Sequence, residues 1–287
     1  MQAVSASRTT ARFQPLSATM GADTSDIDVS HADAVPMDDV LAAFRQHHLL
    51  SFRGQTLTDE QIYNFAAKFG PVEQNKRRYA DGTVMASVHG ITNLDADGKP
   101  SSRPDVRENY YWHSDKSHQE VPALTTMLYG VEIPPAGGET EFADMTRAYA
   151  ALPPETKRRI DDLKVEHSWG YMRETVAGLA PTEEEKLKSP PVIHPLVRIH
   201  PDTGAKSLYV GMYCSRVIGM DVSEGRELLK EMIDHATRPE FLFRYKWRQG
   251  DLVMWDNRCL VHRALDNFEM DKHRRILRRV VVRGTRP

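Results

Sequence analysis

The feature that most constrains the fold is a series of short strand-like runs, separated by turn residues and interrupted by only a few helical segments. The runs are rich in β-branched and aromatic residues, which favour strands. Neither an internal repeat nor a change of composition divides the chain. We therefore expect one domain over residues 1–287 that is mainly β with helical decoration, a β-sandwich or jelly-roll barrel. The clearest runs are 49–54, 110–115, 123–133, 139–145, 196–200, 206–211 and the closing segments FLFRYKW, DLVMWD and RILRRVVVRG.

Helices are predicted where apolar residues recur at helical spacing. One begins near Asp38, and a second begins at Thr58, which forms a capping-box pattern with Gln61. The segments 145–152, 153–163 and 223–237 complete the set.

Two long stretches, 74–108 and 168–191, are polar and rich in Gly and Pro. Long irregular segments inside a compact domain are usually functional, so we predict active-site loops here. Residues 1–12 are rich in Ser, Thr and Ala, and we expect them to be disordered.

Charge and composition exclude several classes of protein. Lys and Arg number 38 against 40 Asp and Glu, a formal net charge of −2 that is not that of a polybasic nucleic-acid binder. No stretch approaches the roughly 18 apolar residues of a membrane span. The two cysteines, Cys214 and Cys259, match no disulfide or zinc-finger spacing and fit a reducing compartment. We predict a cytoplasmic protein with neither nucleic acid nor membrane as a partner.

Histidine is the unusual component, with twelve in the chain. On a strand, residues i and i+2 share a face, so a His-x-Asp pair offers an imidazole and a carboxylate to one metal ion. The chain holds three such pairs, at His31, His113 and His200, and about one is expected by chance. Only His113-Asp115 follows a strongly apolar and aromatic run, whereas the pair at His200 begins a hairpin turn. A structural role at the end of a strand is the alternative for His113.

A second apolar strand, in the segment GDLVMWDNRCLVHRA, is followed by a cluster of polar residues and by His262. Together with His113 and Asp115 this histidine would complete a facial triad of two histidines and one carboxylate, which leaves positions open for a bidentate cosubstrate and O₂ on Fe(II). A buried structural histidine is the alternative.

The closing segment HRRILRRVVVRG places arginines among residues typical of a core. Strand periodicity puts Arg275 and Arg279 on one face, and Arg274 and Arg278 on the other. A solvated charge run or a nucleic-acid stripe is the alternative interpretation. A buried guanidinium needs a partner, and a dicarboxylate would suit it well.

These motifs together resemble the iron(II)- and 2-oxoglutarate-dependent dioxygenases of the taurine dioxygenase family, and within it the aryloxyalkanoate (dichlorophenoxyacetate-type) enzymes. The resemblance extends from about Phe13 to the C-terminus, and four ordered motifs carry it. They are WHSD (112–115), PPAGGETEF (134–142), WDNRCLVHR (255–263) and RRILRR (274–279), with FRGQTLTDEQI (52–62) near the start. The resemblance implies a double-stranded β-helix (jelly roll).

The resemblance also implies roles for single residues. His113, Asp115 and His262 match the iron ligands of the family. Thr140 matches the threonine that hydrogen-bonds a carboxylate of 2-oxoglutarate, and Arg275 matches the arginine that clamps its distal carboxylate.

Two further positions concern the substrate. Arg279 matches the residue that pairs the carboxylate or sulfonate of anionic substrates, and Asn109 is a weaker match to a substrate-contacting position. The span between His262 and Arg275 is a residue or two longer than the family leads us to expect. Arg274 is therefore the alternative clamp, since a one-residue shift of register reverses every side chain.

The expected activity is hydroxylation of a small anionic organic substrate with Fe(II), 2-oxoglutarate as cosubstrate and O₂, releasing succinate and CO₂. An aryloxyalkanoate would give a phenol and an oxo acid, and a sulfonate or alkyl sulfate is the alternative substrate. A zinc-dependent hydrolase or cupin-type isomerase is the rival class, and it has no use for Thr140 or Arg275. The resemblance implies a homodimer or homotetramer as the assembly. For His89 and His167 we prefer structural or surface roles.

Overall fold

Two β-sheets form the body of the protein in this computed structural model, which describes residues 12–74, 86–102 and 107–287. The larger sheet has seven strands in the order β1-β2-β3-β13-β5-β15-β4, and the smaller has the order β12-β6-β14. The larger sheet contains β1 (Gln14–Pro15), β2 (Ala22–Thr24), β3 (Leu49–Phe52), β4 (His89–Thr92), β5 (Ala123–Glu132), β13 (Leu252–Asp256) and β15 (Ile276–Arg283). The smaller contains β6 (Thr140–Asp144), β12 (Leu242–Tyr245) and β14 (Leu260–Ala264).

One hydrophobic cluster joins the inner faces of these two sheets. Leu128, Trp255 and Leu277 of the larger sheet meet Phe142 and Leu260 of the smaller one. The rings of Phe142 and Trp255 lie 5.4 Å apart in an edge-to-face arrangement. This face-to-face packing is the jelly roll that the sequence predicts.

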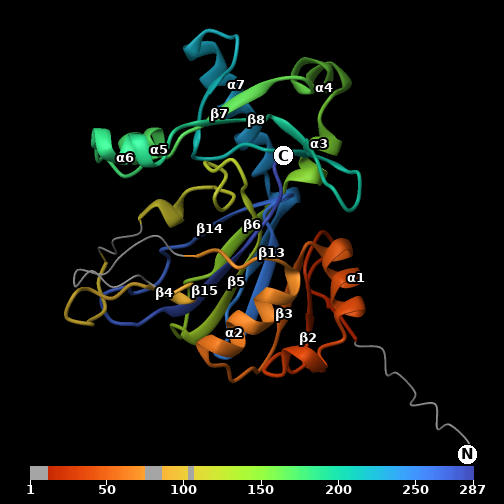
Figure 1. The fold of residues 1–287 in the computed structure, drawn as a ribbon, viewed down its shortest axis with the longest axis vertical. Helices are drawn as coiled ribbons and strands as arrows, with labels where there is room; N and C mark the ends of the chain where they lie inside the picture. Colours follow the sequence, from red (N-terminus) through yellow and green to blue (C-terminus); the bar gives the residue numbers. More distant parts are fainter. Residues whose placement is uncertain (1–11, 75–85, 103–106) are drawn as a thin grey trace, which may run out of the picture.

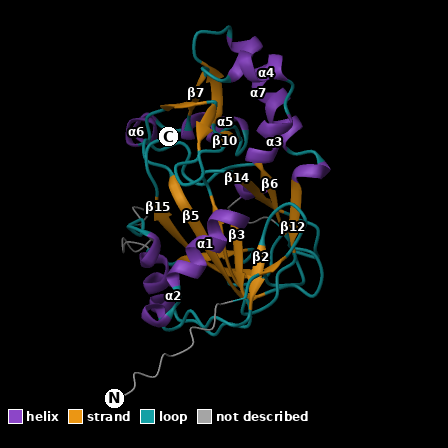
Figure 2. Ribbon diagram, turned by 90° about the vertical axis from the view of Figure 1, so that its right-hand side faces the viewer, coloured by secondary structure: helices purple, strands orange, loops and turns teal. Residues whose placement is uncertain are grey.

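Helices cover the outer face of each sheet (Figure 1). The helices α1 (Met37–His47) and α2 (Asp59–Ala66) pack on the larger sheet, and α3 (Met145–Ala151) and α7 (Val222–Ala236) pack on the smaller one. Figure 2 shows α3, α4 (Pro154–Ile160) and α7 gathered at the end of the molecule opposite α2. The capping box of Thr58 and Gln61 that opens α2 is confirmed.

Strand alternation assigns each residue of the central strands to one of these cores. On β5, Leu128 faces the inner cluster, whereas Met127 and Tyr129 face α1 and α2. On β15, Leu277 faces inward, whereas Val280 and Val282 face outward. Arg275 and Arg279 share the parity of Leu277, so the fold directs them between the sheets.

The strands β7 to β11 lie beside the smaller sheet. A third sheet has the order β11-β7-β8, and β9 pairs with β10 in the hairpin that the sequence predicts. Their bounds are β7 (Lys164–His167), β8 (Val192–Pro195), β9 (Val197–Ile199), β10 (Lys206–Leu208) and β11 (Cys214–Val217). Short 3₁₀ helices are η1 (Ala32–Ala34), η2 (Ala67–Phe69), η3 (Arg107–Tyr110) and η4 (Pro239–Phe241). Within the described ranges, no helix combines the length and the apolar character needed to cross a lipid bilayer.

Two expectations about local structure are wrong. Residues 110–115 do not form a strand, because η3 extends to Tyr110 and only a single bridge then joins His113 to His262 of β14. Residues 168–191 are not irregular throughout, since they contain α5 (Trp169–Thr175) and α6 (Glu183–Lys188). Thr182 and Glu185 form a capping box at the start of α6. In the sequence, Glu185 is one of three consecutive glutamates, which makes this pattern hard to recognise. Residues 1–11 of the predicted disordered start, and part of the expected strand near 84–88, lie outside the described residues.

Candidate active site

A cavity of about 1490 Å³ is lined by residues from both facing sheets. Its lining includes every residue that the sequence analysis selected for metal, cosubstrate or substrate, namely Asn109, His113, Asp115, Thr140, His262, Arg275 and Arg279. The segments predicted as active-site loops contribute to the same wall, for instance through His89 and Glu108, and through Trp169 and Met172.

Strand periodicity and a single backbone bridge bring His113, Asp115 and His262 together. His262 lies on β14 with the parity of Leu260, so its ring points between the sheets. The N–H of His113 donates to the carbonyl of His262 at 3.1 Å, and the N–H of His262 donates back at 2.8 Å. Asp115 follows two residues later, and the three side chains meet with their donor atoms within 4.8 Å of one another.

The donor atoms in this group suit a divalent metal ion. Nε2 of His113 lies 3.9 Å from Oδ1 of Asp115, and Nε2 of His262 lies 3.6 Å from Oδ2. The Nδ1–H of His113 donates to the carbonyl of Tyr111 at 2.7 Å, so the ring keeps its lone pair on Nε2. Nδ1 of His262 is buried and has no hydrogen-bond partner among the described residues.

The protonation states also suit a metal ion. Burial lowers the pKa of His113. Burial and repulsion by the neighbouring His113 ring lower the pKa of His262 to a greater extent. Both imidazoles are therefore neutral near pH 7. Burial alone would raise the pKa of Asp115, but Arg279, the two imidazoles and the Thr126 hydroxyl outweigh it and lower that pKa. Two neutral histidines and one ionised carboxylate are the forms that bind metal.

Arg275 carries a buried charge with no carboxylate paired to it among the described residues. Its Nε–H donates to the carbonyl of Gly138 at 2.8 Å, and Nη2 lies 3.5 Å from Oγ1 of Thr140. A Cβ on Gly138 would lie 3.2 Å from Cδ of Arg275, so the glycine leaves room for this side chain. Burial lowers the pKa of Arg275 to about 10, and the guanidinium stays charged at neutral pH.

Thr140 begins β6 beside Arg275 with its hydroxyl proton available to an acceptor. Nε1–H of Trp247 donates to Oγ1 of Thr140 at 3.0 Å. Because indole and guanidinium nitrogens only donate, Oγ1 accepts from this side, and the hydroxyl proton can point to another group. A carboxylate in the cavity would find a hydroxyl donor and a cation side by side.

The structure distinguishes Arg275 from Arg274. Arg274 points outward, is about half exposed and pairs with Glu132 at 3.1 Å between Nε and Oε2. Arg278 also faces outward and pairs with Asp59 of α2. Of the two adjacent arginines, Arg275 is thus the one that lines the cavity.

Arg279 has a contact that the sequence did not indicate. Its Nη2–H donates to Oδ1 of Asp115 at 2.6 Å, so the arginine predicted to hold the substrate also holds this carboxylate. A guanidinium has five N–H donors, and the pair with Asp115 uses one of them. Asn109, in η3, lines the same cavity.

Two histidines of uncertain role lie in different places. His167 is fully buried, stacks on Tyr209 with ring centroids 5.0 Å apart and lies 3.6 Å from Sγ of Cys214, which indicates the structural role we preferred. His89 is instead half-buried and lines the cavity, contrary to our preference. Its position in β4, opposite Arg279, explains this placement.

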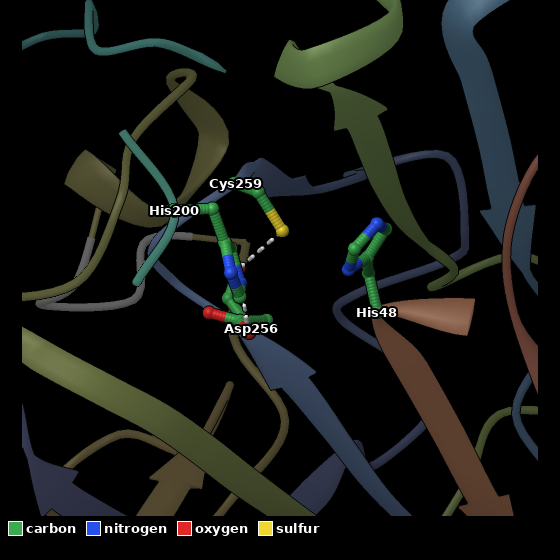
Figure 3. A group of neighbouring side chains, drawn as sticks. All are labelled: His48, His200, Asp256 and Cys259. Carbon is green, nitrogen blue, oxygen red and sulfur yellow. Dashed lines mark hydrogen bonds and ion pairs between the residues drawn. The ribbon is translucent and has the colours of Figure 1, made fainter. Parts of the chain in front are cut away.

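A second group of potential ligands consists of His48, His200, Asp256 and Cys259, whose donor atoms also lie within 4.8 Å of one another (Figure 3). Nε2–H of His200 donates to Asp256 at 2.9 Å, and its Nδ1 accepts the backbone N–H of Asp202 at 3.3 Å, so neither nitrogen is available. Burial raises the pKa of the Cys259 thiol, which disfavours the thiolate that metals bind. The guanidinium of Arg258 already pairs with Asp256. We assign this group a structural role.

A jelly roll that holds two histidines and one carboxylate beside a cavity is the architecture of a mononuclear non-haem metal oxygenase. The comparison with family models agrees, because residues 12–281 match the taurine catabolism dioxygenase TauD, TfdA family. The chain belongs to this family.

Individual relatives agree with the family assignment. An alpha-ketoglutarate-dependent 2,4-dichlorophenoxyacetate dioxygenase of Cupriavidus pinatubonensis is 39% identical over 264 residues, which cover 87% of this chain and 90% of the relative. An (S)-phenoxypropionate/alpha-ketoglutarate-dioxygenase of Sphingobium herbicidovorans is 34% identical over 87% of this chain and 88% of its own length. The crystal structure of AAD-2 in complex with Mn(II) and N-oxalylglycine superposes with a TM-score of 0.88, at 37% identity, over 97% of this chain and 99% of that one.

The two ligand groups predict different results in a metal titration. We expect the protein to bind one Mn(II) per chain by calorimetry, the His262→Gln variant to lose this binding, and the Cys259→Ser variant to retain it. The reason is that all three residues of the group His113, Asp115 and His262 offer donor atoms in the forms that bind metal, whereas in the second group His200 and Asp256 bind each other and Cys259 is a protonated thiol. Two ions per chain, or loss of binding in Cys259→Ser, would contradict this assignment.

Proposed function

We propose that the protein is a 2-oxoglutarate-dependent dioxygenase that hydroxylates a small anionic organic substrate, with His113, Asp115 and His262 as ligands of Fe(II). The observation that carries the proposal is the buried guanidinium of Arg275, which has no acidic partner in the described chain yet shares a cavity with this triad. A buried cation without a counter-ion is costly, and a bound carboxylate removes that cost.

Arg275 and Thr140 bind and orient 2-oxoglutarate. The planar guanidinium receives the distal carboxylate through two parallel hydrogen bonds, and the hydroxyl of Thr140 donates to a carboxylate oxygen. Bound Fe(II), with 2-oxoglutarate and O₂, supplies the oxidising chemistry that hydroxylates a substrate C–H bond and releases succinate and CO₂. A zinc hydrolase or a cupin-type isomerase would not require the carboxylate-binding site that Arg275 and Thr140 form beside the metal ligands.

Arg279 holds the anionic group of the organic substrate. Its guanidinium lies at the cavity wall beside Asp115, so an anion that it binds stays close to the metal ligands. The remaining wall offers apolar surface for an organic group, from Ile91 and Leu128 on the strands and from Trp169, Met172 and Met212 on the other side.

An aryloxyalkanoate fits this combination of one cation and apolar walls. When the carbon next to its ether oxygen is hydroxylated, the resulting hemiacetal breaks down to a phenol and an oxo acid. A sulfonate or an alkyl sulfate would satisfy the same guanidinium and is the second candidate. A homodimer or homotetramer, and a location in the cytoplasm, stay predictions from the sequence.

A substrate screen tests the proposed class directly. We expect O₂-dependent succinate release to be stimulated most by phenoxyacids, less by alkyl sulfates and sulfonates, and least by uncharged aryl ethers, because only an anion can pair with Arg279. The measurement is succinate formed per enzyme in the presence of Fe(II) and 2-oxoglutarate. Equal stimulation by an uncharged aryl ether would contradict the anionic substrate, and preference for an alkyl sulfate would reassign its class.

The cosubstrate site predicts a contrast between two adjacent arginines. Arg275→Ala is expected to raise the KM for 2-oxoglutarate at least about 30-fold, since a buried charged hydrogen-bond pair contributes roughly 2 kcal/mol or more. Arg274→Ala removes the same charge from the outer face and should change that KM less than about twofold. Both are measured by succinate formation, with Mn(II) binding as the check that the metal site is intact. An unchanged KM in Arg275→Ala would exclude this residue as the clamp.

A further inference from the structure

Two buried polar side chains lie behind the candidate metal site. Thr126 lies on β5 with the inward parity of Leu128, and Asn257 lies in the turn between β13 and β14. They are 0% and 1% exposed. We propose that Asn257 and Thr126 are positioning residues that fix the carboxylate of Asp115 through a hydrogen-bond relay of defined direction. This inference rests on the proposed role of Asp115 as a metal ligand.

The relay is continuous from the turn to the carboxylate. Oγ1 of Thr126 donates to Oδ2 of Asp115 at 2.6 Å, and Nδ2–H of Asn257 donates to Oγ1 of Thr126 at 3.0 Å. Oδ1 of Asn257 accepts the backbone N–H of Asp115 at 3.1 Å. The asparagine therefore holds both the main chain and, through Thr126, the side chain of the same residue.

The donors around Asn257 determine the direction of the relay. Nε1–H of Trp255 and the backbone N–H of Asp115 both lie 3.1 Å from Oδ1 of Asn257, and each of these groups only donates. The amide oxygen must face them, so the amide nitrogen faces Thr126. Oγ1 of Thr126 then accepts from Asn257, and its single proton is left for Asp115. No other arrangement of these hydrogens satisfies all four groups.

A second set of contacts holds Asn257 in place. Asp256, which is fully buried, accepts hydrogen bonds from the guanidinium and the backbone N–H of Arg258. His200 donates to the same carboxylate (Figure 3), and Asp202 pairs with Arg258 at 2.8 Å. The His200-x-Asp202 pair thus holds the turn that begins with Asn257.

The relay defines how Asp115 presents its oxygens. Thr126 donates to Oδ2 and Arg279 donates to Oδ1, so both carboxylate oxygens of Asp115 are held in place. Asp115 is only 6% exposed. Hydrogen bonds that orient a ligand typically change metal affinity or activity 10- to 100-fold when they are removed. The proton of Thr126 also favours the ionised form of Asp115 over the protonated one.

A threonine on the opposite face of β5 provides a matched control. Thr125 is also 0% exposed, but its odd parity places it on the side of α1 and α2, away from Asp115. We compare Thr126→Val, Thr126→Ser and Thr125→Val in the full chain by the Kd for Mn(II), measured by calorimetry. Valine matches the shape of threonine without its hydroxyl, whereas serine keeps the hydroxyl.

Thr126→Val is expected to weaken Mn(II) binding at least about tenfold, whereas Thr126→Ser and Thr125→Val stay within about threefold of the unmodified protein. Asn257→Asp should reproduce the effect of Thr126→Val, since a carboxylate would accept the Thr126 proton and turn the hydroxyl away from Asp115. Equal affinities in Thr126→Val and Thr125→Val would overturn the relay. Absence of Mn(II) binding in the unmodified protein would instead overturn the proposed function, so the two failures are distinguishable.

Discussion

The ionised carboxylate of Asp115, buried between the two sheets, is the constraint on which the candidate site depends. Burying a charge is costly unless it is paired and hydrogen-bonded. Arg279 and Thr126 contact its two oxygens, and the imidazoles of His113 and His262 lie beside it. These neighbours lower the pKa of Asp115 against the effect of burial, so the negative charge that a metal ion requires is already present in the fold.

The jelly roll supplies these neighbours from segments far apart in the sequence. The smaller sheet contributes His262 and Thr140, the larger sheet contributes Thr126 and Arg279, and a bridge to β14 fixes the segment of Asp115. Alternation along β15 sends Arg275 and Arg279 inward and leaves Arg274 and Arg278 to pair with acids on the outer face. β15 and the residue that precedes it therefore place two arginines at the cavity wall.

Much of this was predictable from sequence, because strand periodicity and helix capping are local. The positions of most strands along the chain, the helices α1, α2 and α7, and the meeting of His113, Asp115 and His262 in one cavity follow from such patterns and from the family resemblance. What could not be predicted depends on contacts between distant segments. In the sequence, nothing distinguishes Thr126 from other polar residues of a strand or Asn257 from other residues of a turn. Only the folded chain shows that both lie next to Asp115. The error at residues 110–115 has the same origin, since an aromatic run favours a strand but only one bridge to β14 is available.

An anaerobic titration of the protein with Fe(II) and 2-oxoglutarate tests directly whether one cavity binds the metal ion and the cosubstrate together. Chelation of the metal by the keto acid within the site would produce a visible metal-to-ligand charge-transfer absorption band. We expect this band to saturate at one Fe(II) and one 2-oxoglutarate per chain. A protein that binds Fe(II) yet develops no such band with excess 2-oxoglutarate would contradict this expectation.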